Sequence, residues 1–82
     1  MIADVKLPDG WKAEQRGHLG QYVITNPAWD GAMTVSFTHR NFEPGYSTVH
    51  HTAFNKYSGR GWKQRLVNDA VAKLTETYED EK

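Results

Sequence analysis

The sequence predicts an α+β fold, a four-stranded antiparallel meander sheet with one C-terminal helix packed on one face (ββββα). Apolar and polar residues alternate over residues 32–40, which is typical of a strand with one buried and one solvated face. From Trp62 to Tyr78 the apolar residues recur at spacings of three and four, which indicates an amphipathic helix. Because 82 residues support a single domain, we expect the apolar stripe of this helix to be buried against the sheet.

The first two strands follow a short N-terminal arm. The arm, residues 1–10, ends in LPDG, in which proline fixes φ and glycine accepts positive φ, as turns require. WKAEQR, residues 11–16, is predicted as the first strand, and QYVIT, residues 21–25, as the second. NPAWDG then closes a hairpin, with the Asp30-Gly31 pair as its turn signal.

The third strand is the clearest of the four, and the fourth is the weakest. AMTVSFTHR, residues 32–40, is the predicted third strand, and NFEPG is expected to break the chain after it. YSTVHHTAF, residues 46–54, is the predicted fourth strand, so the sheet spans residues 11–54. The face of the third strand that should meet the helix carries Met33, Val35, Phe37 and His39.

The helix is predicted over residues 59–78, followed by an acidic tail at 79–82 that should fray. Ser58 is a plausible N-cap, because its hydroxyl can accept a hydrogen bond from the first turn. The predicted core consists of Trp11, Ile24, Met33, Val35, Phe37 and Val49 from the sheet and Trp62, Leu66, Val67, Val71 and Leu74 from the helix.

Composition narrows the class of protein. Ten Lys and Arg balance ten Asp and Glu, so the net charge is zero. A dedicated nucleic-acid binder usually carries a basic excess, so this balance argues mildly against that class. The absence of cysteine excludes a disulfide framework and suits a reducing cytoplasm. No apolar run approaches the length of a membrane span, and the N-terminus lacks the apolar core of a signal peptide. We therefore expect a cytoplasmic protein that does not bind membranes.

The predicted fold leaves one face of the sheet open to solvent. Such a face, rich in Ser, Thr and Arg, can lie against nucleic acid; by analogy of fold, small sheets backed by a C-terminal helix do so in the arm-binding domains of tyrosine integrases and the plant ethylene-response domain. Ser and Thr also favour exposed strand positions, so a merely solvated face is the alternative. The residues expected on this face are Lys12, Glu14, Arg16, Thr34, Ser36, Thr38 and Arg40.

The start of the helix is a candidate anion site. KYSGRGWKQRL, residues 56–66, holds four basic residues and no acid, although a helix N-terminus favours acids. A bound phosphate or carboxylate would account for this pattern. The alternatives are a tight turn with solvated bases, or the acidic tail of a second copy at this position. The segment is not a Walker A loop, and its candidates are Lys56, Gly59, Arg60, Gly61, Lys63 and Arg65.

The sequence does not predict an enzyme, a metal site or a cofactor. Of the four histidines, His50 and His51 are adjacent and would point to opposite faces of a strand, so they cannot share a site. Two histidine ligands do not make a zinc site. Ser47 or Ser58 could pair with a histidine, but nothing in the sequence places them together.

Three aromatic residues on predicted loops, Trp29, Phe42 and Tyr46, are candidates for protein interaction. Exposed aromatic side chains often anchor partner proteins. The alternative is that each folds back to cover one end of the small core.

LPDGW and KYSGRGWKQRLVNDAVAKL, at Leu7–Trp11 and Lys56–Leu74, resemble small proteins carried by bacteriophages and prophages of proteobacteria. The resemblance implies a phage origin and a host-cytoplasm setting, and it implies no activity. Two hypotheses follow. The first is a non-enzymatic accessory protein that binds a protein partner. The second is a nucleic-acid-binding module that uses the open sheet face or the basic start of the helix.

Overall fold

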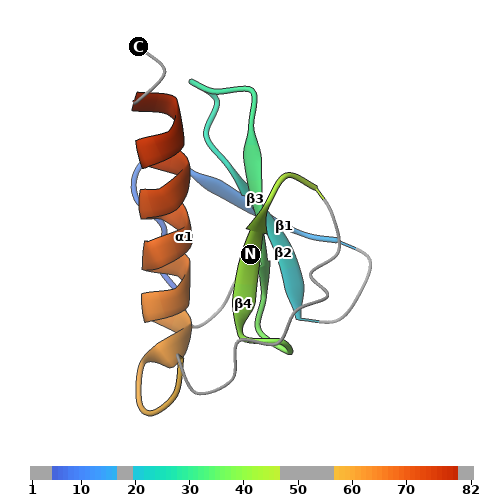
Figure 1. Cartoon of the computed structure of the whole chain (residues 1–82), viewed down its shortest axis with the longest axis vertical. Helices are drawn as coiled ribbons and strands as arrows, with labels where there is room; N and C mark the ends of the chain where they lie inside the picture. Colours follow the sequence, from blue (N-terminus) through green and yellow to red (C-terminus); the bar gives the residue numbers. More distant parts are fainter. Residues whose placement is uncertain (1–4, 17–19, 47–56, 80–82) are drawn as a thin grey trace.

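The computed structural model, which describes residues 5–16, 20–46 and 57–79, shows a sheet with one helix across a single face (Figure 1). The sheet is an antiparallel meander of order β1-β2-β3-β4. The predicted ββββα arrangement is therefore confirmed. The elements are β1 (Lys12–Gln15), β2 (Gln21–Thr25), β3 (Ala32–Ser36), β4 (Asn41–Pro44) and α1 (Trp62–Glu79). Within these ranges, no helix combines the length and the hydropathy that crossing a bilayer demands.

The position of the fourth strand corrects the sequence prediction. Asn41–Pro44, expected to break the chain, forms β4 and pairs with β3, with Phe42 opposite Val35. The third strand therefore ends at Ser36, and the turn contains Arg40 at a φ of 54°. Phe42 packs against the core, which favours a strand here, and Pro44 is tolerated because it ends an edge strand. Tyr46 lies in a bend, and residues 47–54 are outside the described residues.

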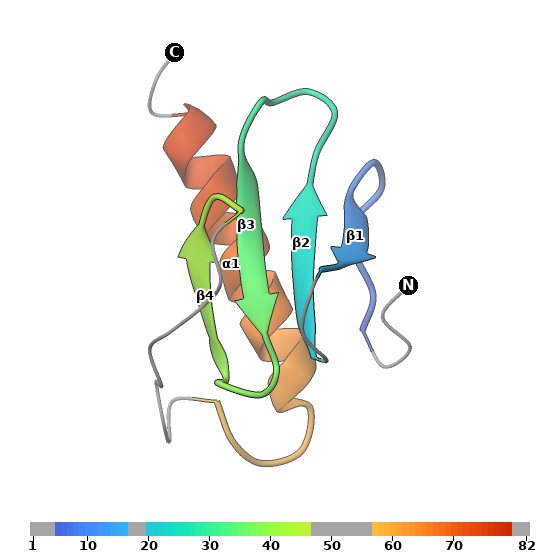
Figure 2. The same cartoon turned by 90° about the vertical axis from the view of Figure 1, so that its right-hand side faces the viewer.

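The core lies between the helix and the central strands. α1 packs against β3 and β4 (Figure 2). The sheet contributes Ile24, Met33 and Val35 to the core. Among the predicted core residues, Leu66, Val67 and Leu74 are also fully buried, whereas Trp11, Phe37, Trp62 and Val71 are partly buried against the cluster. Ala70, which lies on the predicted apolar stripe of the helix, is buried with them, Tyr57 was not expected there, and Val49 is outside the described residues.

The helix begins later than predicted. Gly61 has a φ of +77°, which a right-handed helix does not permit, so α1 starts at Trp62 rather than at residue 59. Arg65 donates its backbone N–H to Gly61 at 3.2 Å, which puts Gly61 rather than Ser58 in the N-cap position.

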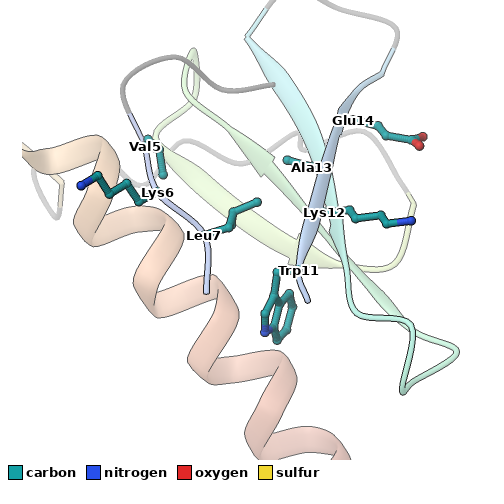
Figure 3. Close-up of a pocket in the computed structure, with 7 residues that line it drawn as sticks. All are labelled: Val5, Lys6, Leu7, Trp11, Lys12, Ala13 and Glu14. Atoms are coloured by element: carbon teal, nitrogen blue, oxygen red, sulfur yellow. The ribbon is translucent and has the colours of Figure 1, made fainter. Parts of the chain in front are cut away.

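The described part of the N-terminal arm is tied to the helix. Lys6 donates its backbone N–H to Gln64 Oε1 at 2.8 Å, and Gln64 Nε2 donates to the carbonyl oxygen of Lys6 at 2.9 Å. These two bonds place the arm between α1 and β1 (Figure 3). The arm therefore belongs to the packed structure, and it forms one wall of a surface hollow beside β1.

Candidate functional site

The loop before α1 is held by one of the arginines predicted to bind an anion. Arg65 Nη1 donates to the carbonyl oxygen of Arg60 at 2.7 Å, and Nη2 donates to the carbonyl oxygen of Ser58. Gly59 and Gly61, both at positive φ, allow the backbone to curl around this guanidinium. Arg65 thus binds the loop itself, which favours the alternative of a tight turn before the helix. Arg60 is exposed, and Lys56 is outside the described residues.

Arg40 lies at the helix start, not on an open sheet face as predicted. Its guanidinium carbon stands 4.4 Å from the ring centroid of Trp62, and Nη1 donates to the carbonyl oxygen of Tyr57 at 3.0 Å. Lys63 Nζ lies 5.9 Å from the same Trp62 centroid and 5.5 Å from that of Phe37. Because β3 ends early, the turn carries Arg40 across to the helix. The structure therefore brings Arg40 and Lys63 together, with both cations against aromatic rings.

Tyr57 fixes the chain where it approaches α1. Its hydroxyl donates to Asp69 Oδ2 at 2.6 Å, and its ring is buried in the core. Burial, together with the hydrogen bond and the negative charge of Asp69, raises the pKa of Tyr57 well above its ordinary value. The hydroxyl thus stays protonated and joins the loop to the second turn of the helix. Through this contact and the bond from Arg40, Tyr57 is linked both to the β3–β4 turn and to α1.

The sheet face predicted to be open is closed at its centre. Thr34 and Ser36, expected to point to solvent, are only 2% and 0% exposed. Thr34 Oγ1 donates to the carbonyl oxygen of Gly45 at 2.7 Å, so its hydroxyl is satisfied within the protein. Val23, which lies beside Thr34 in the register, is 5% exposed. Thr38 is exposed, but in the turn after β3 rather than on a strand.

Ser36 forms a contact with a histidine that sequence reasoning did not foresee. Its Oγ lies 3.0 Å from His39 Nδ1 and accepts the backbone N–H of His39 at 3.0 Å. This pair closes the β3–β4 turn, and the Ser36 hydroxyl is too deeply buried to reach a substrate. Within the described ranges, no three His, Asp or Glu side chains are grouped as metal ligands would be. The histidines at positions 18, 50 and 51 are outside those ranges.

The three loop aromatics take different positions. Trp29 stacks on Tyr78 with ring centroids 5.4 Å apart and an interplanar angle of 10°, and its edge meets Trp11 at 5.6 Å. Phe42 packs against the core. These two therefore cover the core, as the alternative interpretation held. Tyr46 is 51% exposed, and it is the large hydrophobic side chain that the described structure leaves most open to solvent.

A hollow of about 560 Å³ lies between the N-terminal arm and β1 (Figure 3). Figure 3 shows Leu7 directed toward β1, while Lys12 and Glu14 point away from the helix. The walls are mostly apolar and the rim is charged, a combination common in binding sites. Sequence reasoning missed this site because the arm looked like a mere turn. The alternation of apolar and charged residues before LPDGW was the available signal. The lining residues are Val5, Lys6, Leu7, Trp11, Lys12, Ala13 and Glu14.

Among the described residues, no strand pairs with the outer edge of β1, which lies beside this hollow. β1 is the end strand of the sheet, at the right-hand side of Figure 2. Arg16 donates its backbone N–H to the carbonyl oxygen of Gln21 at 3.1 Å. Because every second residue of an antiparallel strand bonds to the same neighbour, the backbone groups of Lys12 and Glu14 also point toward β2. The N–H and C=O groups of Ala13 and Gln15 consequently point away from the sheet.

Two smaller hollows of about 280 and 330 Å³ lie on the other side of β1, and both are lined by Glu14 and Tyr46. Arg16 stands over the Tyr46 ring, with its guanidinium carbon 5.1 Å from the centroid. The exposed tyrosine and the candidate Arg16 therefore belong to the neighbourhood of β1. Hollows on both sides of this edge strand make β1 the candidate binding surface of the described structure.

Comparisons with known proteins do not add a family to this picture. No protein-family model matches the chain, and searches of curated proteins and of solved structures gave no significant match.

Proposed function

We propose that this protein is a non-enzymatic binding module whose partner is a protein, and that β1 with its adjoining hollow is the contact surface. One observation carries the proposal: the outer edge of β1, which pairs with no strand in the described part of the chain, lies directly beside a mostly apolar hollow of about 560 Å³. Backbone groups and apolar pockets together are what an added strand uses, because the backbone supplies affinity and the alternate side chains supply specificity.

The geometry suits an extended segment of the partner that adds to the sheet next to β1. Its backbone would bond to the outward N–H and C=O groups of Ala13 and Gln15. Side chains of an added strand alternate between faces, so every second one would enter the hollow near Leu7 and Trp11. The others would lie beside Lys12 and Glu14, whose opposite charges favour a polar residue there.

The expected affinity is moderate. A buried aliphatic side chain contributes about 1.5–3 kcal/mol, and each backbone hydrogen bond about 0.5–1.5 kcal/mol. The loss of translational and rotational freedom offsets much of this sum. β1 contains four residues, so the added strand would be short. We therefore expect a partner that dissociates readily, as transient complexes of small interfaces do.

A protein partner fits the structure better than nucleic acid does. The Thr34 and Ser36 hydroxyls are buried, so they cannot form a nucleic-acid surface. At the helix start, Arg65 bonds to its own loop, and Arg40 stacks on Trp62. The balanced charge of the chain supplies no basic excess for phosphate contacts. Binding of nucleic acid is therefore the alternative that the test below can detect.

The biological setting of the proposal comes from the sequence resemblance. A small accessory protein of phage or prophage origin would act in the host cytoplasm and meet host proteins there. The lack of cysteine is compatible with that compartment.

The test compares substitutions at one exposed position of the edge. Gln15→Pro removes an outward N–H without removing a bond to β2, whereas Gln15→Ala removes only the side chain. The wild type and Gln15→Ala should capture the same protein partner from a nuclease-treated proteobacterial lysate. Gln15→Pro should reduce capture about tenfold, because one or two hydrogen bonds are lost.

A second variant, Leu7→Ala, should weaken the same interaction through the hollow. Circular dichroism and the thermal midpoint control for folding of each variant. Capture that is unaffected by Gln15→Pro would contradict the proposed surface. Capture that disappears on nuclease treatment would favour the nucleic-acid alternative instead.

A further inference from the structure

We propose that a second copy of this chain occupies the β1 edge, so that two sheets join through antiparallel β1–β1 pairing across a twofold axis. The inference rests on the binding surface proposed above and names one occupant for it. It depends on the direction of the β1 backbone groups and on the order of charges along the strand.

The backbone limits how two β1 strands can pair. Because Lys12, Glu14 and Arg16 bond toward β2, the groups free to bond to a second copy belong to Ala13 and Gln15. The Trp11 N–H already donates to the carbonyl oxygen of Pro8 at 3.1 Å. Three registers therefore use the free N–H groups. The first pairs Ala13 with the partner's Ala13, the second pairs Gln15 with the partner's Gln15, and the third pairs Ala13 with the partner's Gln15.

The charges select between these registers. When Ala13 faces the partner's Ala13, Lys12 lies opposite the partner's Glu14, and Glu14 lies opposite the partner's Lys12. When Ala13 faces the partner's Gln15, the two Glu14 side chains oppose each other. Lys12 then also lies opposite the partner's Arg16. When Gln15 faces the partner's Gln15, Glu14 lies opposite the partner's Arg16, but the pairing runs past the end of β1 at Gln15 and leaves Lys12 out of the charge pairs. Opposite charges across a strand pair stabilise it and like charges destabilise it, so the register with facing Glu14 side chains is disfavoured. The pairing centred on Ala13 is favoured, because both charged residues of β1 then meet an opposite charge within the strand.

Side-chain size and position agree with this register. Lys12 and Glu14 would occupy non-hydrogen-bonded positions, where facing side chains lie closest together. Both are exposed and point away from the helix, so they are free to meet across the axis (Figure 3). On the other face, the small Ala13 side chain permits close approach at the axis. The partner's Gln15 would then lie opposite Trp11, at the hollow.

Such pairing has a consequence for the proposed function. The second copy and a protein partner would use the same edge, so they would compete. Self-pairing would also shield an exposed edge from non-specific strand addition. The interface is small, because β1 contributes four residues from each copy. We therefore expect a weak dimer that dissociates at low concentration and releases the edge to a partner.

Charge reversal tests the register. Lys12→Glu places like charges opposite each other across both pairs, and so does Glu14→Lys. Each single variant should weaken self-association at least about tenfold, as measured by sedimentation equilibrium up to millimolar protein. An equimolar mixture of the two variants should associate again, because every opposing pair then carries opposite charges. The double variant Lys12→Glu/Glu14→Lys should associate like the wild type.

Matched controls separate this effect from net charge. Lys73→Glu and Glu76→Lys make the same changes at exposed positions of α1 and should leave association unchanged. Amide NMR spectra would verify that each variant is folded. A wild type that stays monomeric throughout the concentration range would overturn the proposal. So would association that Lys12→Glu leaves intact but removal of residues 79–82 abolishes, since the acidic tail would then be the contact.

The two proposals fail in different ways. If no dimer forms but Gln15→Pro still reduces capture of a partner, the self-pairing is wrong and the binding module stands. If the charge-reversed variants behave as expected but capture does not depend on the edge, the dimer stands and the proposed function is wrong.

Discussion

Arg65 holds the loop in front of α1 by donating a hydrogen bond from Nη1 to the carbonyl oxygen of Arg60, at 2.7 Å. A second bond from Nη2 reaches the carbonyl oxygen of Ser58. Carbonyl oxygens of a loop thus take the place that an external anion was predicted to fill beside this guanidinium. Within this basic segment, Arg65 therefore stabilises the loop that precedes the helix.

Arg65→Ala should lower the free energy of unfolding by about 1–2 kcal/mol, because hydrogen bonds from a charged donor to the loop are lost. Arg60→Ala is the matched control, since its side chain is exposed and its carbonyl remains in place. Urea denaturation of both variants measures the difference. Equal stability of the two variants, with a loss of phosphate affinity in Arg65→Ala, would restore the anion-site hypothesis.

Trp29→Ala should destabilise the fold, whereas Tyr46→Ala should leave its stability nearly unchanged. Trp29 covers the core and stacks on Tyr78, so its removal should destabilise the fold by about 2–4 kcal/mol. Tyr46 is half exposed, and its removal should change stability by less than about 0.5 kcal/mol. Thermal unfolding and partner capture, measured in parallel, check both expectations. A neutral Trp29→Ala would show that the stack is unimportant for the fold.

Gly31→Ala should destabilise the fold by about 1–3 kcal/mol, because the new Cβ would overlap the Tyr78 hydroxyl and the adjacent ring carbons. Tyr78→Phe removes the nearest of those atoms, so the double variant should recover part of the loss. A double-mutant cycle by denaturant unfolding measures this coupling. Purely additive effects would mean that the helix end moves aside to accommodate the methyl group.

Stability should fall above pH 10, because folding raises the pKa of Tyr57. The unfolded chain releases the Tyr57 proton near the ordinary pKa of 10.0, whereas the folded protein keeps it to higher pH. The stabilisation is therefore fully present below that value and is lost as the pH rises toward the folded pKa. Tyr57→Phe should flatten this part of the pH profile relative to the wild type. Urea unfolding between pH 8 and about 11 makes the comparison, and identical slopes would refute the assignment.

Much of the fold could be predicted from periodicity alone. The alternation in residues 32–36 predicted a strand, and the helical spacing from Trp62 onward predicted a helix, so β3 and α1 were found, although Thr34 and Ser36 are buried rather than solvated. β4 was not, because Asn41–Pro44 is short and contains a proline, which local rules assign to a turn. Its pairing depends on Phe42 reaching the core opposite Val35, a contact between segments.

For the candidate site, too, the sequence predicted some features and the tertiary structure decided the others. The sequence indicated which residues are basic, aromatic or small, but it did not determine where Arg40, Arg65 and Thr34 would direct their polar groups. Those directions depend on partners supplied by other segments, such as the carbonyl oxygens of Tyr57 and Gly45. The hollow beside β1 exists only because the arm is bonded to Gln64, 58 residues away from Lys6.

The sequence by itself determined the class of fold, the amphipathic helix and the balance of charge, because these are local or compositional properties. Tertiary structure alone decided which segment forms β4, which cations are engaged and which aromatic stays exposed. The physical reason is that burial and hydrogen bonding are satisfied between distant segments. Trp29 and Tyr46 look alike along the chain, yet only Trp29 has Tyr78 to stack against.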